Sequence, residues 1–228
     1  MQFEVLEDAG AVAKRAAQLI AGVARDAVTA RGRFVFAVSG GRTPWVMLRL
    51  LADEDVPWPN VHVVQVDERV APAGDPDRNL TALRASLLEH APLAADRIHP
   101  MPVESDDLTA AARRYAAMLE ALAGSPPTLD LVHLGLGSDG HTASLLPGDP
   151  ALDVDDAAVA LTLAYQGRRR MTLTYPVIDR ARRILWVVVG ADKAPALERL
   201  RRADRSIPGG RVRQDDAVVL ADRAAAAR

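Results

Sequence analysis

The sequence predicts an α/β fold in which a mainly parallel sheet is covered by helices on both faces. Three continuous apolar segments, RFVFAV (33–38), VHVVQV (61–66) and LDLVHL (129–134), alternate with segments of helical periodicity. Strands that are buried on both faces have such unbroken apolar runs. Each segment is followed by a polar or glycine-bearing turn: SGGRTP, DER and GLGSDGH. Since ligands bind at the carboxyl ends of parallel strands, these turns predict one shared site.

The individual elements are assigned from hydrophobic periodicity and from the turn residues that separate them. In the first half they are a short strand at 2–7, an amphipathic helix at 9–30, a strand at 33–38, a helix at 44–51, a strand at 61–66 and a helix at 80–90. In the second half they are a short strand at 97–102, a helix at 106–123, strands at 129–134, 157–164 and 184–189, a helix at 194–203 and a strand with a short helix within 215–227. No linker or repeat divides the chain, so one domain is predicted over residues 1–228.

Composition excludes several classes of function. The 228 residues include no cysteine, which rules out disulfides, thiolate catalysis and cysteine-bound zinc. The net charge of −2 gives no overall basic field for nucleic acid, so an anionic ligand needs a local cluster of cations. The charged N-terminus does not resemble a signal peptide, and no run reaches the ~20 apolar residues of a membrane helix. A cytoplasmic location is therefore expected.

The turn SGGRTP has the features of an anion site. Gly40 and Gly41 permit a tight turn with positive φ, so that backbone N–H groups approach a ligand closely. Thr43 is expected to cap the following helix and Pro44 to occupy its first position. The N–H groups and dipole of that helix start suit a phosphate. A plain strand-to-helix turn is the alternative for this segment taken alone.

The turn GLGSDGH offers a candidate general base. It satisfies G-x-G-x-x-G, but Pro147-Gly148-Asp149-Pro150 leaves no room for the helix of a dinucleotide site. An imidazole titrates near neutrality, so His141 can take a proton from water and return it to a leaving oxygen, with Asp139 orienting the ring. Structural or surface roles are expected for the other four histidines, which are His62, His90, His99 and His133.

Cations and a carboxylate follow other strands. Arg69 can pair with a phosphate or carboxylate, and Asp67 can bind a sugar hydroxyl, although a salt-bridged turn would also explain DER. Lys193 follows the apolar strand ILWVVVG, where a solvated lysine is the alternative. Arg170 belongs to the basic cluster 168–170, of which most side chains are expected to face water. With no clustered histidines and no cysteine, no metal site is expected.

These segments together resemble the 6-phosphogluconolactonases, within a larger fold family shared with the glucosamine-6-phosphate deaminases. The resemblance rests on SGGRTP, DERVAPAGDPDRN, LGLGSDGHTASLLPG, RMTLTYPVI, VGADKA and DDAVVLADRAA, in that order. It implies a Rossmann-like topology and a hydrolase of the oxidative pentose phosphate pathway. Such an enzyme opens the ring of 6-phospho-D-glucono-1,5-lactone with no metal or cofactor. The implied partner is this small molecule, with no nucleic acid or membrane, for a monomer or small homo-oligomer.

The resemblance also assigns residues. His141 matches the histidine that activates water, and Asp139 and Asp67 match acidic positions of the site. Positions that contact substrate, mainly its phosphate, match Ser39, Gly40, Gly41, Thr43, Arg69, Arg170 and Lys193. Arg78 stands where the family usually has serine.

Two alternatives remain at this point. The first is a deaminase or isomerase of the sister family, in which phenylalanine, asparagine and glutamate stand at the positions of Ala143, Ser144 and Leu145. This chain therefore has no carboxylate at short range after His141 to serve isomerisation. The second is a sugar-phosphate-binding regulator, which would need a DNA-binding segment that the sequence does not offer.

Overall fold

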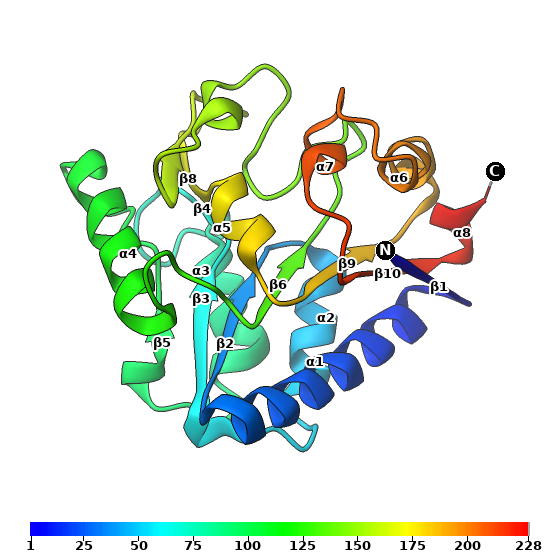
Figure 1. Cartoon of the computed structure of the whole chain (residues 1–228), viewed down its shortest axis with the longest axis horizontal. Helices are drawn as coiled ribbons and strands as arrows, with labels where there is room; N and C mark the ends of the chain where they lie inside the picture. The colour runs from blue at the N-terminus through cyan, green and yellow to red at the C-terminus, as the bar shows by residue number, and fades with distance from the viewer. Residues whose placement is uncertain (228) are drawn as a thin grey trace.

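Seven parallel strands form the main sheet of the computed structural model, which describes residues 1–227 (Figure 1). In their order across the sheet they are β1 (Gln2–Leu6), β10 (Ala217–Asp222), β9 (Ile184–Val188), β6 (Leu131–Leu134), β2 (Phe34–Val38), β3 (Val61–Gln65) and β5 (Ile98–His99). From β2 the chain moves outward through β3 to β5, then returns to β6 on the other side of β2. The direction of winding thus reverses between β2 and β6, which is where ligands bind in such sheets. The predicted parallel α/β fold is confirmed.

Helices cover both faces of this sheet (Figure 1). One face packs against α1 (Ala9–Arg31), α2 (Arg42–Leu51) and the π-helix Arg84–Leu88, which continues α3 (Asn79–Leu83). The other packs against α4 (Leu108–Ala123), α5 (Tyr175–Arg180) and α6 (Ala194–Arg201). The short helices α7 (Pro208–Arg211) and α8 (Arg223–Ala226) lie near the C-terminus. Among the helices within residues 1–227, none has the length and apolar character needed to cross a bilayer.

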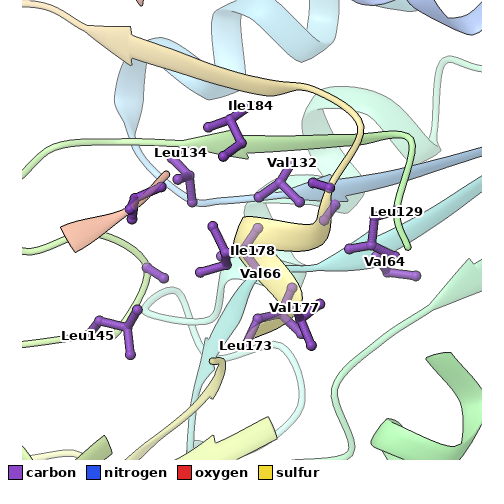
Figure 2. Close-up of a cluster of buried hydrophobic side chains, with 14 of the residues drawn as sticks. Val64, Val66, Leu129, Val132, Leu134, Leu145, Leu173, Val177, Ile178 and Ile184 are labelled. Carbon is purple, nitrogen blue, oxygen red and sulfur yellow. The ribbon is translucent and has the colours of Figure 1, made fainter. Parts of the chain in front are cut away.

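Apolar contacts on the α5 side fix this helix against the centre of the sheet. Val177 and Ile178 of α5 belong to the same buried cluster as Val132 and Leu134 of β6, and Figure 2 shows Ile178 directed toward that strand. Both α5 residues are fully buried. Full burial of an aliphatic side chain contributes about 1.5–3 kcal/mol, so these contacts hold the strand that leads into the GLGSDGH turn.

A second, antiparallel sheet stands beside the carboxyl ends of the main one. It comprises β4 (Asp67–Arg69), β8 (Arg170–Leu173) and β7 (Val159–Leu161), in the order β4-β8-β7. The prediction of a polar turn at DER was therefore wrong. These residues form a strand, which pairs with the strand that begins at Arg170. Neither β8 nor α5 was among the predicted elements. The strand expected at 157–164 exists, but it belongs to this small sheet.

The start of α2 also differs from the prediction. The helix begins at Arg42 with Gly41 as its N-cap, so Thr43 and Pro44 are the second and third helical residues. Gly41 has φ +135°, a conformation that glycine adopts readily and that lets the chain enter the helix two residues early. No side chain caps this helix. Its first N–H groups are thus left to other partners.

Candidate active site

A pocket of about 500 Å³ lies at the carboxyl ends of β2, β3, β6 and β9. These four strands are neighbours in the sheet, and the segment that follows each of them contributes to the pocket. Nine of the ten predicted site residues line it: Ser39, Gly40, Gly41, Thr43, Asp67, Arg69, His141, Arg170 and Lys193. The tenth, Asp139, contacts His141 from outside the lining. The structure therefore brings together residues that are spread over about 150 positions of the sequence.

His141 is held by a short turn after β6. Its Nδ1 lies 2.6 Å from Oδ1 of Asp139, and its backbone N–H donates to the same oxygen at 3.1 Å. The turn brings these groups so close to Gly137 that a Cβ at this position would overlap both side chains. Partial burial opposes ionisation of Asp139, but the hydrogen bonds and the nearby imidazole prevail and lower the pKa of this carboxyl. Because Asp139 occupies Nδ1, Nε2 is the nitrogen left to accept a proton.

Two arginines face each other across the small sheet. Arg69 and Arg170 are direct partners in the antiparallel pairing of β4 with β8, and both line the pocket. Arg170 is only 5% exposed, and its Nε has no hydrogen-bond partner among the described residues. Burial, together with the charge of Arg69, lowers the pKa of Arg170. Like charges placed directly opposite each other repel, so an anion between them would be stabilised.

Asp67 supplies a buried carboxyl beside these cations. It is 4% exposed and accepts a hydrogen bond of 2.6 Å from the hydroxyl of Ser144. The side-chain amide of Asn79 donates to the backbone oxygen of Asp67 at 2.9 Å. Burial raises the pKa of Asp67, although Ser144 and the two arginines, Arg69 and Arg170, act in the opposite direction. The pocket thus contains a carboxyl whose charged form depends on its neighbours.

A fully buried carboxylate behind the pocket fixes this corner. Glu68 accepts the backbone N–H groups of Arg69, Asn79 and Leu80, each at 2.8 Å, and so satisfies the N-terminal N–H groups of α3. Arg78 is 2% exposed, and its Nε lies 3.2 Å from Glu68 Oε2, at ion-pair distance but outside hydrogen-bond geometry. Asn79 in turn accepts a hydrogen bond of 2.6 Å from Arg69. This arrangement fixes the position of Arg69 at the pocket wall.

The opposite wall combines a helix start with a lysine. Residues 39–44, from the end of β2 into α2, all line the pocket. The backbone N–H of Ser39 donates to Nδ1 of the buried His133 at 3.3 Å, which ties this turn to β6. Lys193 lies in the turn after β9, and its Nζ is 3.1 Å from a carboxylate oxygen of Asp192. This wall is suited to an anion, because it combines the N–H groups of a helix start with the ammonium group of Lys193.

Four contributors to the site were not predicted as such, and one of them, Arg42, is a further cation of the pocket lining. Ser144 was noted only as a position that differs in the deaminases, and Asn79 was not assigned to the site. Tyr165 was not considered, yet its ring lies beside both His141 and Arg170. The basic cluster 168–170 was a partial signal, because an arginine that enters an apolar strand, as in RMTL, indicates a buried guanidinium. For metals, no group of three or more potential ligands gathers within residues 1–227.

Comparison with known proteins finds relatives over most of the chain. The family model described as glucosamine-6-phosphate isomerases/6-phosphogluconolactonase matches residues 7–220. The chain is 37% identical over 198 residues to a 6-phosphogluconolactonase of Nostoc sp., covering 85% of this chain and 82% of the relative. It is 35% identical over 240 residues to a 6-phosphogluconolactonase of Mycobacterium tuberculosis, covering 99% and 97%. The crystal structure of the devB protein superposes with a TM-score of 0.88 at 28% identity, covering 99% and 98%.

Proposed function

Since this chain belongs to the glucosamine-6-phosphate isomerase/6-phosphogluconolactonase family, we propose that it hydrolyses 6-phospho-D-glucono-1,5-lactone to 6-phosphogluconate. The observation that carries the proposal is the pairing of His141 with Asp139 in a pocket that also holds the cations Arg69, Arg170 and Lys193. An enzyme that hydrolyses a phosphorylated lactone needs both a base that takes a proton from water and cations that bind the phosphate. The reaction would belong to the oxidative pentose phosphate pathway.

In the proposed mechanism, water attacks the lactone carbonyl directly. His141 accepts a proton of this water at Nε2 and then gives it to the ring oxygen that leaves. Because water is the nucleophile, no covalent intermediate with the enzyme forms. Asp139 holds the ring through Nδ1 and stabilises the imidazolium that arises after proton transfer. The carbonyl oxygen becomes an oxyanion during the attack, and donors fixed at the pocket wall would stabilise it.

The cations are proposed to anchor the charged end of the substrate. Lys193 and the start of α2, including Ser39, Gly40, Gly41 and Thr43, form one candidate phosphate site. Arg69 and Arg170 form a second cationic group near Asp67, where an oxyanion or a second phosphate contact would be stabilised. An anchored phosphate places the carbonyl near His141 and converts the reaction into an effectively unimolecular step. Asp67 would bind a sugar hydroxyl.

The family description also names an isomerase activity, so membership alone does not choose the reaction. The residues after His141 favour the lactonase. Ala143 lines the pocket, Ser144 is engaged with Asp67, and Leu145 is fully buried in the core. The sugar-phosphate isomerases and deaminases need a carboxylate in this segment, and the described lining offers only Asp67 and Asp192 as carboxylates.

One paired assay tests the proposal. Freshly prepared 6-phosphogluconolactone is added to the purified protein, and proton release is recorded against the spontaneous hydrolysis rate. Glucosamine 6-phosphate is added to the same preparation, and ammonia release is recorded. Proton release without ammonia is the expected result. Ammonia release would instead support the deaminase, and binding of sugar phosphate with neither reaction would support a regulator.

The remaining expectations belong to the same proposal. We expect the enzyme to act in the cytoplasm as a monomer or small homo-oligomer, with no nucleic acid or membrane as partner. We also expect the reaction to need no cofactor and no metal, because the proposed steps use only side chains and water. Activity that persists after prolonged treatment with EDTA would support this, whereas a loss restored by zinc or magnesium would contradict it.

A further inference from the structure

Tyr165 contacts two residues of the pocket lining, His141 and Arg170. The guanidinium carbon of Arg170 is 5.0 Å from the centre of the Tyr165 ring, within the range of a cation–π contact. The imidazole of His141 lies on the same ring at 6.3 Å between centroids, with the planes tilted by 60°. Such a tilted arrangement is favourable for two aromatic rings at this separation. One side chain thus contacts both the proposed base and a proposed anion-binding cation.

Arg170 has few other contacts that fix its guanidinium. Its Nε has no hydrogen-bond partner among the described residues, and its Nη2 reaches Gln166 only at the limiting distance of 3.5 Å. Arg69, directly opposite in the sheet, repels it. The charge of Asp67 attracts the guanidinium, and the face of the Tyr165 ring is the surface against which it lies.

The turn that carries Tyr165 is itself held firmly. Tyr165 and Arg168 exchange backbone hydrogen bonds of 2.9 and 3.3 Å across a two-residue turn, whose central residues, Gln166 and Gly167, have φ values of +52° and +78°. Positive φ at both positions is typical of the tight turns that match the twist of a hairpin. Arg168 then binds two carboxylates of the loop before α3, Asp75 at 2.9 Å and Asp77 at 3.2 Å. The ring of Tyr165 is thus placed by backbone and ionic contacts that lie outside the pocket.

From these contacts we propose that Tyr165 is a positioning residue, which sets the guanidinium of Arg170 relative to the imidazole of His141. The inference rests on the proposed lactonase function. Tyr165 does not belong to the pocket lining, so it would act on the substrate through Arg170 and His141, which do. Its role requires the aromatic face and not the hydroxyl, for which the structure gives no hydrogen-bond partner within residues 1–227.

The test compares Tyr165→Leu with Tyr165→Phe, which keeps the ring, and with Leu163→Ala as a matched control. Leu163 is 62% exposed in the same segment and contributes nothing to the pocket lining. Loss of a cation–π contact predicts that Tyr165→Leu raises KM for 6-phosphogluconolactone by about 2- to 30-fold. The same variant should weaken calorimetric binding of 6-phosphogluconate by a similar factor. Tyr165→Phe should restore most of both quantities, and Leu163→Ala should leave them unchanged.

A double-mutant cycle shows whether Tyr165 acts through Arg170. In an Arg170→Ala background, Tyr165→Leu should cost little further affinity for 6-phosphogluconate, because the residue that it positions is gone. Additive losses, or equal affinities of wild type and Tyr165→Leu at unchanged melting temperature, would overturn the inference.

The binding and rate measurements separate this inference from the proposed function. A wild type that binds 6-phosphogluconate but does not hydrolyse the lactone refutes the lactonase, and the cycle still decides the role of Tyr165. A wild type that neither binds 6-phosphogluconate nor hydrolyses the lactone would refute both the lactonase function and the role of Tyr165.

Discussion

The carboxylate of Asp139 makes two contacts with His141, one to the ring nitrogen Nδ1 and one to the backbone N–H two residues along the chain. Both are made inside a single turn that is closed by the hydrogen bond from the Gly137 N–H to the His141 carbonyl at 2.8 Å. The pair is therefore assembled locally, before any substrate binds. Two contacts from outside the turn add to it: the Gly209 N–H donates to the Gly140 carbonyl at 2.8 Å, and the Tyr165 ring lies beside the imidazole.

Replacing His141 by alanine should lower kcat by a factor of about 10²–10⁴, the usual contribution of a general base. Asp139→Asn should cost less, about 10- to 100-fold, in line with the energy of a hydrogen bond to a charged group. Binding of 6-phosphogluconate should survive in both variants, because the cations lie on other strands. Initial rates, calorimetry and melting temperature on one preparation check this. A folded, product-binding His141→Ala protein with normal turnover would mean that the base lies elsewhere.

Lys193→Ala should raise KM for the phosphorylated lactone by about 10- to 100-fold, because it removes a charged contact to phosphate. The slow hydrolysis of unphosphorylated gluconolactone should change little. The chain supplies a matched control, since Lys14 is its only other lysine and is exposed on α1. Lys14→Ala should behave as wild type with both substrates. Equal losses on both substrates in Lys193→Ala would remove Lys193 from the phosphate site.

Ser144→Ala should shift the acidic limb of the kcat/KM profile to higher pH. Burial already raises the pKa of Asp67, and the hydrogen bond from Ser144 is the strongest contact that opposes this effect. Without that donor the charged carboxylate loses stabilisation, so its pKa rises further and Asp67 takes up a proton at higher pH. The profile should be recorded for wild type, Ser144→Ala and Asp67→Asn. An acidic limb in the Ser144 variant that coincides with that of the wild type would argue that the charge on Asp67 is not needed.

His133 predicts an acid-sensitive component of stability. Burial lowers the pKa of this histidine from 6.5 to about 3. Between these values the unfolded chain binds a proton that the folded protein excludes, so stability is lost as pH falls below 6.5. One such group contributes a slope of at most about 1.4 kcal/mol per pH unit.

His133→Asn should flatten this dependence, while its side-chain oxygen can still accept the N–H of Ser39. The free energy of unfolding by urea, measured for both proteins between about pH 7 and pH 5, gives the two slopes. The slope of the variant should be smaller but not zero, since burial also lowers the pKa of His62 to about 4. Parallel curves for the two proteins would show that His133 does not contribute in this pH range.

The parallel sheet could be predicted because its signal is local. Strands buried on both faces, such as β2 and β9, are unbroken apolar runs in the sequence, and the turns after them carry the polar residues of the pocket. This pattern alone is enough to predict that one pocket gathers the residues at the strand ends, which are Ser39, Asp67, His141 and Lys193. The resemblance to a family then supplied Arg170, which the residues themselves indicated only as part of the basic cluster 168–170.

The small sheet could not be predicted in this way. The pairing that sets Arg69 opposite Arg170 joins residues about 100 positions apart, and a three-residue strand such as β4 gives no periodic signal. Arg78 is a second example. A charged residue in a loop rich in Pro, Asp and Gly is expected to be exposed, yet Glu68 holds it in the interior. Such burial depends on a partner from another element, and no local pattern contains that information.

The pairing of β1 with β10 has a consequence for biosynthesis. Residues 2–6 form the edge of the main sheet, and their neighbour in it is the strand at 217–222 (Figure 1). At roughly 5–20 residues per second, a ribosome makes β10 about 10–40 s after β1. During this interval the first strand and the apolar stripe of α1, which packs against β10, have no completed surface to cover them. Closure of the sheet is thus one of the last events in the maturation of the nascent chain, and a message cut short before codon 217 would leave the N-terminal strand without the neighbour that it has in the folded protein.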